Sequence, residues 1–298
     1  MHNGFELPVY GCGTWQMGGR LERDLNNDDN ADVVALKTAI DSGIIHFDTA
    51  ELYADGYTEQ LLAKAIKNYD RSKLFIVSKV KAENLAYENV ITSCKKSIKR
   101  LETSYLDLYL LHAYNPAFDL REAMKALDVL VESGFVKNIG VANFTKERLA
   151  EAQGYTKNKI VCNQVHYNLQ VRELEKNELL RYCQHNDILI IAWRPLGKGK
   201  LLENVPSLIQ EMCKKYNKSP AQIALNWLIS QDNVVTISKT RSIKHLEENL
   251  GSIGWEMTKE DIEKIRSSYP NQKDVSDVDV IRLPINGTIV FRNPGWGK

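Results

Sequence analysis

The chain has 298 residues, 43% of them hydrophobic and 26% charged, which is typical of soluble globular proteins with a large core and argues against disorder. Lysine and arginine number 39 against 38 acidic residues, and the formal net charge of +1 gives no broad basic surface for nucleic acid or anionic membranes. The length suits either two domains or one barrel of alternating strands and helices, which commonly takes about 250 residues.

The cysteines and the N-terminus narrow the class of protein further. The five cysteines, at positions 12, 94, 162, 183 and 213, form neither a CxxC pair nor a cysteine and histidine spacing suited to zinc, so we expect reduced thiols and no metal. The chain has no apolar run of about 18 residues for a membrane span, and residues 1–10 lack the layout of a secretion signal. We therefore expect a cytoplasmic protein that binds neither nucleic acid nor membranes.

Eight short apolar runs recur after a turn predicted at Asn3-Gly4. Each run is continuously apolar, as expected of strands in a parallel sheet that is covered on both faces. The predicted strands are residues 9–14, 44–48, 74–79, 106–111, 139–142, 160–164, 188–192 and 234–238.

Helical periodicity fills the stretches between these runs. Apolar side chains recur every three or four positions over residues 85–101 and again over residues 120–131. Ser219, Pro220 and Gln222 predict the capping box of an extra helix before the eighth strand, over residues 219–230. Thr258 and Asp261 form a similar pair, which predicts a helix over 258–269 after the last repeat.

Alternating strands and helices imply right-handed crossover connections. Eight of each, with no long linker, favour one closed (β/α)8 TIM barrel over residues 1–269, with an N-terminal turn or hairpin; an open doubly wound sheet is the alternative. Residues 270–298 show no clear period. This irregular tail is an active-site loop, a disordered end or an addition foreign to the protein.

Polar side chains close almost every predicted strand, at the edge where barrels of this kind gather their chemistry. They are Asp48 with Tyr53 in the next loop, Lys79, His112, Asn143, Gln164, Trp193 with Arg194, and Lys239 with Thr240 and Arg241. Each has an ordinary explanation by itself, such as a helix cap or a satisfied buried histidine. Burying unpaired charges costs free energy, so a purely structural barrel has no need for polar side chains at so many strand ends. Together these residues therefore predict a proton-transfer site.

Several segments, in one order along the chain, resemble the aldo-keto reductases. They are "HFDTAELYADGYTEQLLAKAI", "VSKV", "LYLLH", "GVANF", "VCNQVHYN", "AWRPLG" and "TISKTRSIKHLEENL". The resemblance extends over about residues 9–269. It implies the reversible NAD(P)H-dependent reduction of an aldehyde or ketone to an alcohol, with Asp48, Tyr53, Lys79 and His112 as the catalytic tetrad.

The chemistry of these four residue types supports the roles that the resemblance implies. Tyr53 would be the general acid that protonates the carbonyl oxygen as the hydride arrives, a role that contributes roughly 10²–10⁴-fold. Because a free tyrosine has a pKa of about 10, we expect the Lys79 ammonium to lower it toward neutrality. Asp48 would keep that lysine charged and aimed, and His112 would donate a hydrogen bond to the substrate carbonyl.

The resemblance implies a nicotinamide nucleotide bound in extended form. "GCGTWQ" is no dinucleotide fingerprint, because Gln16 stands where the third glycine is required. Asn143 and Gln164 are expected to hold the carboxamide, and Trp193 to stack on the nicotinamide ring, where the family more often has tyrosine. Ala142 replaces the family's usual serine, so one hydrogen bond to the carboxamide is missing.

The loop after the eighth strand predicts the choice of nucleotide. Lys239, Thr240 and Arg241 form a basic, hydroxyl-bearing loop that opens a helix and suits a 2′-phosphate, so we expect NADPH rather than NADH. His245 replaces the family's NADP-binding arginine, and Arg241 would compensate. The remaining predicted cofactor contacts are Gly13, Thr14, Arg194, Pro195, Leu196, Glu248 and Asn249, and the predicted substrate-pocket residues are Trp15 and Tyr114.

Two other functions stay open from the sequence. A Schiff-base aldolase or isomerase would use Lys79 as its amine, which requires a lowered lysine pKa. A neighbouring Asp48 carboxylate would instead raise that pKa. A regulatory subunit that binds the cofactor without turnover would use the same architecture. The expected partner is a small carbonyl substrate, and the expected assembly is a monomer or weak homo-oligomer.

Overall fold

A computed structural model describes residues 4–276, in which eight parallel strands form one closed barrel in the order β1 to β8. The strands are β1 (Tyr10–Gly13), β2 (His46–Asp48), β3 (Phe75–Val80), β4 (Leu106–Leu111), β5 (Val136–Ala142), β6 (Ile160–His166), β7 (Leu189–Trp193) and β8 (Val234–Ser238). The predicted (β/α)8 barrel is confirmed, and the open doubly wound sheet is excluded.

Helices separate the strands and follow the last one. The α-helices are α1 (Asp29–Asp41), α2 (Tyr57–Ile66), α3 (Tyr87–Arg100), α4 (Leu120–Glu132), α5 (Lys146–Gln153), α6 (Glu173–Lys176), α7 (Leu179–His185), α8 (Ser207–Tyr216), α9 (Pro220–Ile229), α10 (Ile243–Leu250) and α11 (Lys259–Ser268). The part of the chain that the structure describes also has four short 3₁₀ segments: η1 (Tyr53–Gly56), η2 (Arg71–Lys73), η3 (Ala82–Asn84) and η4 (Gly197–Leu202). None of the helices within residues 4–276 is long and apolar enough to cross a membrane.

The described residues divide into two compact units by their contacts. One unit contains residues 4–11 and 164–276, and the other contains residues 12–163. The predicted boundary between barrel and tail at residue 269 stays a prediction, because residues 277–298 lie outside the described part. Asn3 of the predicted N-terminal turn also lies outside it, and Gly4 beside it has φ of +76°.

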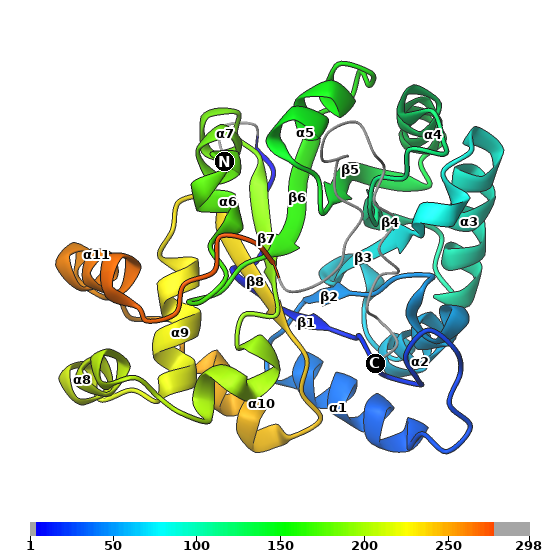
Figure 1. Cartoon of the computed structure of the whole chain (residues 1–298). Coiled ribbons are helices and arrows are strands. Elements are labelled where there is room, and N and C mark those ends of the chain that lie inside the picture. Colours follow the sequence, from blue (N-terminus) through cyan, green and yellow to red (C-terminus); the bar gives the residue numbers. More distant parts are fainter. Residues whose placement is uncertain (1–3, 277–298) are drawn as a thin grey trace. The chain divides into compact units, whose positions relative to one another are not determined.

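The unit of residues 12–163 contains a continuous run of paired strands. Strands β2, β3, β4 and β5 pair in parallel, with Asp48 opposite Val77 and Lys79 opposite Leu110. Helices α1 to α4 lie outside these strands (Figure 1). All six residues of β4 are buried, as predicted for a strand that is covered on both faces.

The unit that contains residues 164–276 has two helices between β7 and β8. Helix α9 was predicted, and its capping box is confirmed: the Ser219 side chain accepts from the Gln222 backbone, and the Gln222 side chain accepts from the Ser219 backbone. Helix α8 was not predicted. It buries only Ile209 and Met212, so its apolar stripe in the sequence is narrow.

Replacing the capping serine tests how much this box stabilises the fold. Ser219→Ala should lower the free energy of unfolding by about 1 kcal/mol, because the Gln222 N–H loses its acceptor. Urea unfolding measures the change. The matched control is Ser207→Ala at the start of α8, where the side chain is exposed and α8 has no side-chain cap hydrogen bond; equal effects of both substitutions would contradict the prediction.

Candidate active site

Four predicted residues meet at the ends of β2, β3 and β4. Lys79 Nζ donates to Asp48 Oδ1 at 2.6 Å and to Tyr53 Oη at 3.4 Å. The Tyr53 and His112 rings lie edge to face, with centroids 5.7 Å apart. All four side chains are buried, with exposed fractions of 1% for Asp48, 6% for Tyr53, 0% for Lys79 and 5% for His112. The structure therefore brings the tetrad of the sequence prediction together within the unit of residues 12–163.

A left-handed turn directly after Tyr53 fixes the position of this phenol. Ala54 and Asp55 have φ of 49° and 53°, and Gly56 follows at 82°. For residues that have a Cβ, this left-handed backbone conformation costs roughly 1–2 kcal/mol per residue. The turn is held from outside, because the Ala54 and Asp55 N–H groups each donate at 2.7 Å to carbonyl oxygens of Arg20 and Leu21.

The Lys79 ammonium keeps its charge although it is fully buried. Burial by itself lowers the pKa of Lys79, but the Asp48 carboxylate and the Tyr53 phenol outweigh burial and raise this pKa above its ordinary value. A third acceptor is the Thr49 carbonyl, 2.8 Å from Nζ. A charged lysine of this kind cannot serve as a Schiff-base amine without first losing its proton, which disfavours that alternative.

The predicted lowering of the Tyr53 pKa toward neutrality was wrong for this structure. Burial raises the pKa of Tyr53, the Lys79 ammonium lowers it and the Asp48 carboxylate raises it again, with the net result above the ordinary value. The prediction weighed the ammonium and left out the loss of solvation around the phenol. Tyr53 therefore carries its proton at neutral pH, which is the form that a general acid needs.

The His112 imidazole is neutral at physiological pH. Burial and the nearby Lys79 ammonium both place the pKa of His112 well below its ordinary value. A neutral imidazole has one N–H donor, so His112 can donate one hydrogen bond without competing with Tyr53 as an acid. Asn143 lies next to it, since the Asn143 side-chain amide donates to the His112 carbonyl oxygen at 3.0 Å.

The predicted pocket aromatics lie in the same unit as the tetrad. Trp15 packs edge to face on Tyr53, with ring centroids 4.9 Å apart. Tyr114 packs edge to face on Phe144, and the Arg148 guanidinium lies 3.8 Å from the centre of its ring. Trp15 is therefore the predicted pocket residue that touches the tetrad directly.

Gly13 and Thr14 lie at the end of β1, and both are buried. The Thr14 N–H and hydroxyl both donate to the Asp48 carbonyl oxygen at 3.0 Å. This placement links the ends of β1 and β2, so Thr14 supports the strand end that bears Asp48. The cofactor contacts predicted for both residues stay predictions.

The unit that contains residues 164–276 bears most of the residues predicted to contact the cofactor. Gln164 is buried in β6, and Trp193 is the last residue of β7. Arg194 turns the chain with φ of 55°, and Pro195 and Leu196 lead into η4. The Trp193 indole stacks face to face on the His166 ring, with centroids 4.4 Å apart and planes 12° apart.

The basic loop after β8 opens α10, as predicted. Lys239, Thr240 and Arg241 precede Ser242, which caps the helix by accepting from the His245 N–H. The Thr240 hydroxyl oxygen accepts from the Ser242 N–H at 3.0 Å and orders the loop. Exposed side chains at Arg241 and His245 place positive and titratable groups beside the helix N-terminus, a favourable position for a phosphate.

Glu248 and Asn249 lie in α10, and only the asparagine is fully buried. The Asn249 side-chain amide donates to Tyr10 Oη and to Ser238 Oγ, each at 3.2 Å. These bonds fix α10 against β1 and β8 within the unit. The adenine contacts predicted for both residues stay predictions.

Three contributors to this arrangement were missed in the sequence. The Thr49 carbonyl that contacts Lys79 leaves no sequence signal, because every residue has a carbonyl. The left-handed turn had a partial signal in Asp55-Gly56, a pair common in turns. His166 had a clearer one: it lies two positions after Gln164, so both side chains point to the same face of β6.

Comparisons with known proteins agree on one family. A family model described as the aldo/keto reductase family matches residues 10–270. The chain is 33% identical over 279 residues to methylglyoxal reductase YeaE of Escherichia coli (strain K12), covering 92% of this chain and 95% of that protein. It is 34% identical over 268 residues to glyoxal reductase of Bacillus subtilis (strain 168), covering 89% of this chain and 90% of that protein.

Solved structures give the same answer. The thermostable aldo-keto reductase Tm1743, crystallised with the inhibitor epalrestat, superposes with a TM-score of 0.86 at 40% identity and covers 89% of this chain and 96% of its own. An aldo/keto reductase from Klebsiella pneumoniae in complex with NADP and acetate superposes with a TM-score of 0.80 at 31% identity, covering 92% of this chain and 96% of its own.

Removing one partner of the Asp48 and Lys79 pair should destabilise the protein strongly. Asp48→Asn leaves a buried ammonium without its counter-charge, and Lys79→Met leaves a buried carboxylate, so each should cost about 3–5 kcal/mol of unfolding free energy. The double variant should cost less than the sum, because it leaves no unpaired charge. Urea unfolding of all four proteins measures the coupling, and simple additivity would argue against a coupled buried pair.

Proposed function

The chain belongs to the aldo/keto reductase family, and on that premise we propose that it reduces a small aldehyde or ketone to an alcohol with NADPH. The observation that carries the proposal is the position of Lys79 Nζ, which contacts both the Asp48 carboxylate and the Tyr53 phenol. A phenol beside a charged lysine and a neutral imidazole can protonate a carbonyl oxygen. That chemistry belongs to an oxidoreductase rather than to a lyase that needs a neutral amine.

The residues present suit a nicotinamide nucleotide. A flat indole at the end of β7 offers a stacking surface for the nicotinamide ring, and a basic loop at the N-terminus of α10 offers cations and N–H groups for a phosphate. When bound, NADPH supplies the hydride for the carbonyl carbon. Trp193 would stack on its nicotinamide, Asn143 and Gln164 would hold the carboxamide, and Lys239 with Arg241 would hold the 2′-phosphate.

Within the tetrad, each side chain has one task in the reduction. His112 donates a hydrogen bond to the substrate oxygen and orients it. Tyr53 donates its proton to the same oxygen as negative charge develops there, and the resulting phenolate is stabilised by the Lys79 ammonium. Asp48 holds that ammonium in place and keeps it charged. In the reverse reaction the phenolate takes the proton from the alcohol.

Small dicarbonyl aldehydes are the first substrates to test. The relatives named above are a methylglyoxal reductase and a glyoxal reductase, and both names specify short aldehydes with a second carbonyl group. Trp15 packs against the proposed acid and would close one side of a small pocket.

The proposed acid can be tested by removing a single hydroxyl. Tyr53→Phe should reduce NADPH oxidation with methylglyoxal at least about 100-fold, because phenylalanine has no hydroxyl proton to donate to the carbonyl oxygen, and should leave NADPH affinity nearly unchanged. Loss of absorbance from reduced nicotinamide measures turnover. Tyr69→Phe, at a surface tyrosine bonded to Asp41, is the matched control. More than about a tenth of normal turnover in Tyr53→Phe would identify another acid.

Nucleotide choice is tested at the loop after β8. The double variant Lys239→Ala with Arg241→Ala should weaken NADPH binding at least about tenfold and NADH binding far less, because only NADPH has the 2′-phosphate. The control is Lys96→Ala with Lys99→Ala, which removes two exposed charges from α3. Titration of each dinucleotide by fluorescence gives the affinities, and equal losses for both nucleotides would reject 2′-phosphate recognition by this loop.

A further inference from the structure

The imidazole that stacks on Trp193 is held by hydrogen bonds at both ring nitrogens. His166 ends β6, and Trp193 ends β7 in the same unit. His166 Nε2 lies 3.2 Å from the side-chain nitrogen of Asn168, and His166 Nδ1 lies 2.7 Å from the hydroxyl of Ser276. A ring that is fixed at both nitrogens has one allowed plane, and the indole lies only 12° from that plane.

The backbone decides which way the Asn168 amide points. Its Oδ1 accepts from the N–H groups of Gln170 and Val171, both at 2.9 Å. Its Nδ2 donates to the carbonyl of Arg194 at 2.9 Å. If the amide were flipped, its NH₂ group would face the N–H donors of Gln170 and Val171, and its oxygen would face the Arg194 carbonyl oxygen. The group that faces His166 Nε2 is therefore an N–H donor.

The proton on the imidazole follows from this orientation. Because Asn168 donates to Nε2, that nitrogen accepts and bears no proton. The ring proton is therefore on Nδ1 and is donated to Ser276 Oγ. His166 thus connects Ser276 to the Trp193 indole with a defined tautomer and a defined ring plane.

Ser276 belongs to residues 272–276, a segment that is hydrogen-bonded to the loop of residues 167–172 after β6. The Lys273 N–H donates to the Gln170 carbonyl at 2.7 Å, and the Arg172 N–H donates to the Lys273 carbonyl at 2.9 Å. The Ser276 N–H donates to the Glu173 carboxylate at 2.7 Å. The segment therefore lies along this loop as a short parallel bridge, Val171 to Lys273.

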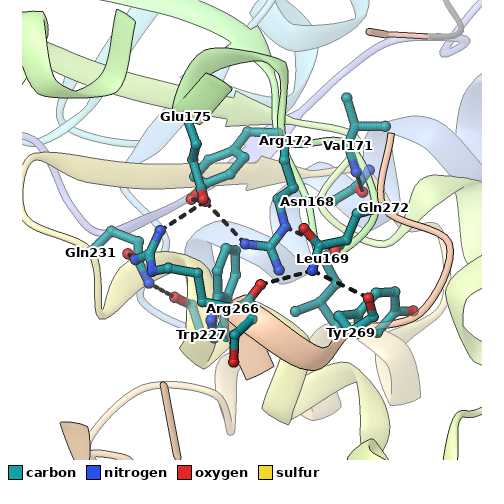
Figure 2. Close-up of polar contacts among 12 residues, drawn as sticks. Asn168, Leu169, Val171, Arg172, Glu175, Trp227, Gln231, Arg266, Tyr269 and Gln272 are labelled. Atoms are coloured by element: carbon teal, nitrogen blue, oxygen red, sulfur yellow. Dashed lines mark hydrogen bonds and ion pairs between the residues drawn. The ribbon is translucent and has the colours of Figure 1, made fainter. Parts of the chain in front are cut away.

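A buried cation, Arg172, supports the same loop (Figure 2). The fully buried Arg172 donates to the Leu169 carbonyl at 2.9 Å, pairs with Glu175 at 3.0 Å and lies 4.0 Å from the centre of the Trp227 ring. Arg266 of α11 pairs with the same Glu175 at 2.9 Å. Gln272, just before the bridge, donates to the Arg266 and Tyr269 carbonyls. The segment that contains Ser276 is therefore held by several hydrogen bonds within this unit.

We propose that His166 is a positioning residue for the nicotinamide half of the cofactor. It would hold one face of the Trp193 indole, so that the opposite face packs on the nicotinamide ring. Through Ser276, residues 272–276 would then contribute to cofactor binding by holding the His166 ring. This inference rests on the proposed function, since it assigns the nicotinamide to Trp193.

Two ligands separate this role from a general loss of structure. NADPH contains the nicotinamide, whereas adenosine 2′,5′-bisphosphate contains only the adenine half. His166→Ala should weaken NADPH binding about three- to tenfold, the range expected for an aromatic pair, and change binding of adenosine 2′,5′-bisphosphate less than about twofold. His166→Phe keeps a flat ring without the two hydrogen bonds and should fall between His166→Ala and the unsubstituted protein.

Two further substitutions complete the set. Ser276→Ala should weaken NADPH alone by about two- to fourfold, because the imidazole loses one of its two fixed contacts. The control is His185→Ala, at an exposed histidine bonded to the Arg181 carbonyl, which should bind both ligands as before. Isothermal titration gives each dissociation constant, and thermal melting confirms that each variant is folded.

The tautomer can be checked without any substitution in the measured protein. Nitrogen-15 spectra distinguish an imidazole protonated on Nδ1 from one protonated on Nε2, and the His166 signals are those missing from His166→Gln. A proton on Nδ1 is the expected result. A proton on Nε2 would overturn the hydrogen-bond chain to Ser276, even if His166→Ala failed to fold.

Other results have distinct meanings. Equal weakening of both ligands by His166→Ala would assign His166 to overall structure. Unchanged NADPH binding would show that Trp193 needs no support, and tighter binding would show that the imidazole covers the face that the nicotinamide needs; either overturns the inference. If the unsubstituted protein reduced no carbonyl and bound no NADPH, the proposed function would fail together with this inference, whereas the outcomes above leave the reductase intact.

Discussion

The buried ion pair between Asp48 and Lys79 is the constraint on which the site depends. An ammonium has three N–H donors, and at Lys79 they face three oxygens: the Asp48 carboxylate, the Thr49 carbonyl and the Tyr53 phenol. A fully buried charge is tolerated only when it is paired and hydrogen-bonded in this way. The contacts that stabilise the buried charge of Lys79 also orient its ammonium toward the Tyr53 phenol.

Burial acts on all members of the site, with a different consequence for each. It raises the pKa of Tyr53 and keeps the phenol protonated, and it lowers the pKa of His112 and keeps the imidazole neutral. Lys79 stays charged against burial, because the Asp48 carboxylate lies beside it and raises the lysine pKa. The resting site thus contains one neutral phenol, one neutral imidazole and one ion pair whose charges balance, an arrangement that suits the proposed reduction, in which charge develops on the substrate oxygen.

Sharp backbone turns place side chains at several strand ends. Asn143 follows β5 with φ of 63°, Arg194 follows β7 with φ of 55°, and Ala54 follows the proposed acid with φ of 49°. Residues with a Cβ adopt this conformation only where neighbouring contacts hold them, and such residues concentrate at functional sites. The carbonyl oxygens of Arg20, Leu21 and His112, with the Asn168 side chain, supply those contacts.

The sequence by itself determined the eight strands, the capping box of α9 and the polar residues at the strand ends, because apolar runs and helix caps are local patterns that the barrel then repeats. It also indicated that Asp48 would keep Lys79 charged, since that depends on two residue types. Only the tertiary structure decided the raised pKa of Tyr53, the left-handed turn at Ala54 and the stack of His166 on Trp193. Solvation, backbone strain and ring contact depend on groups that distant strands and loops bring together, and no local pattern records which groups those are.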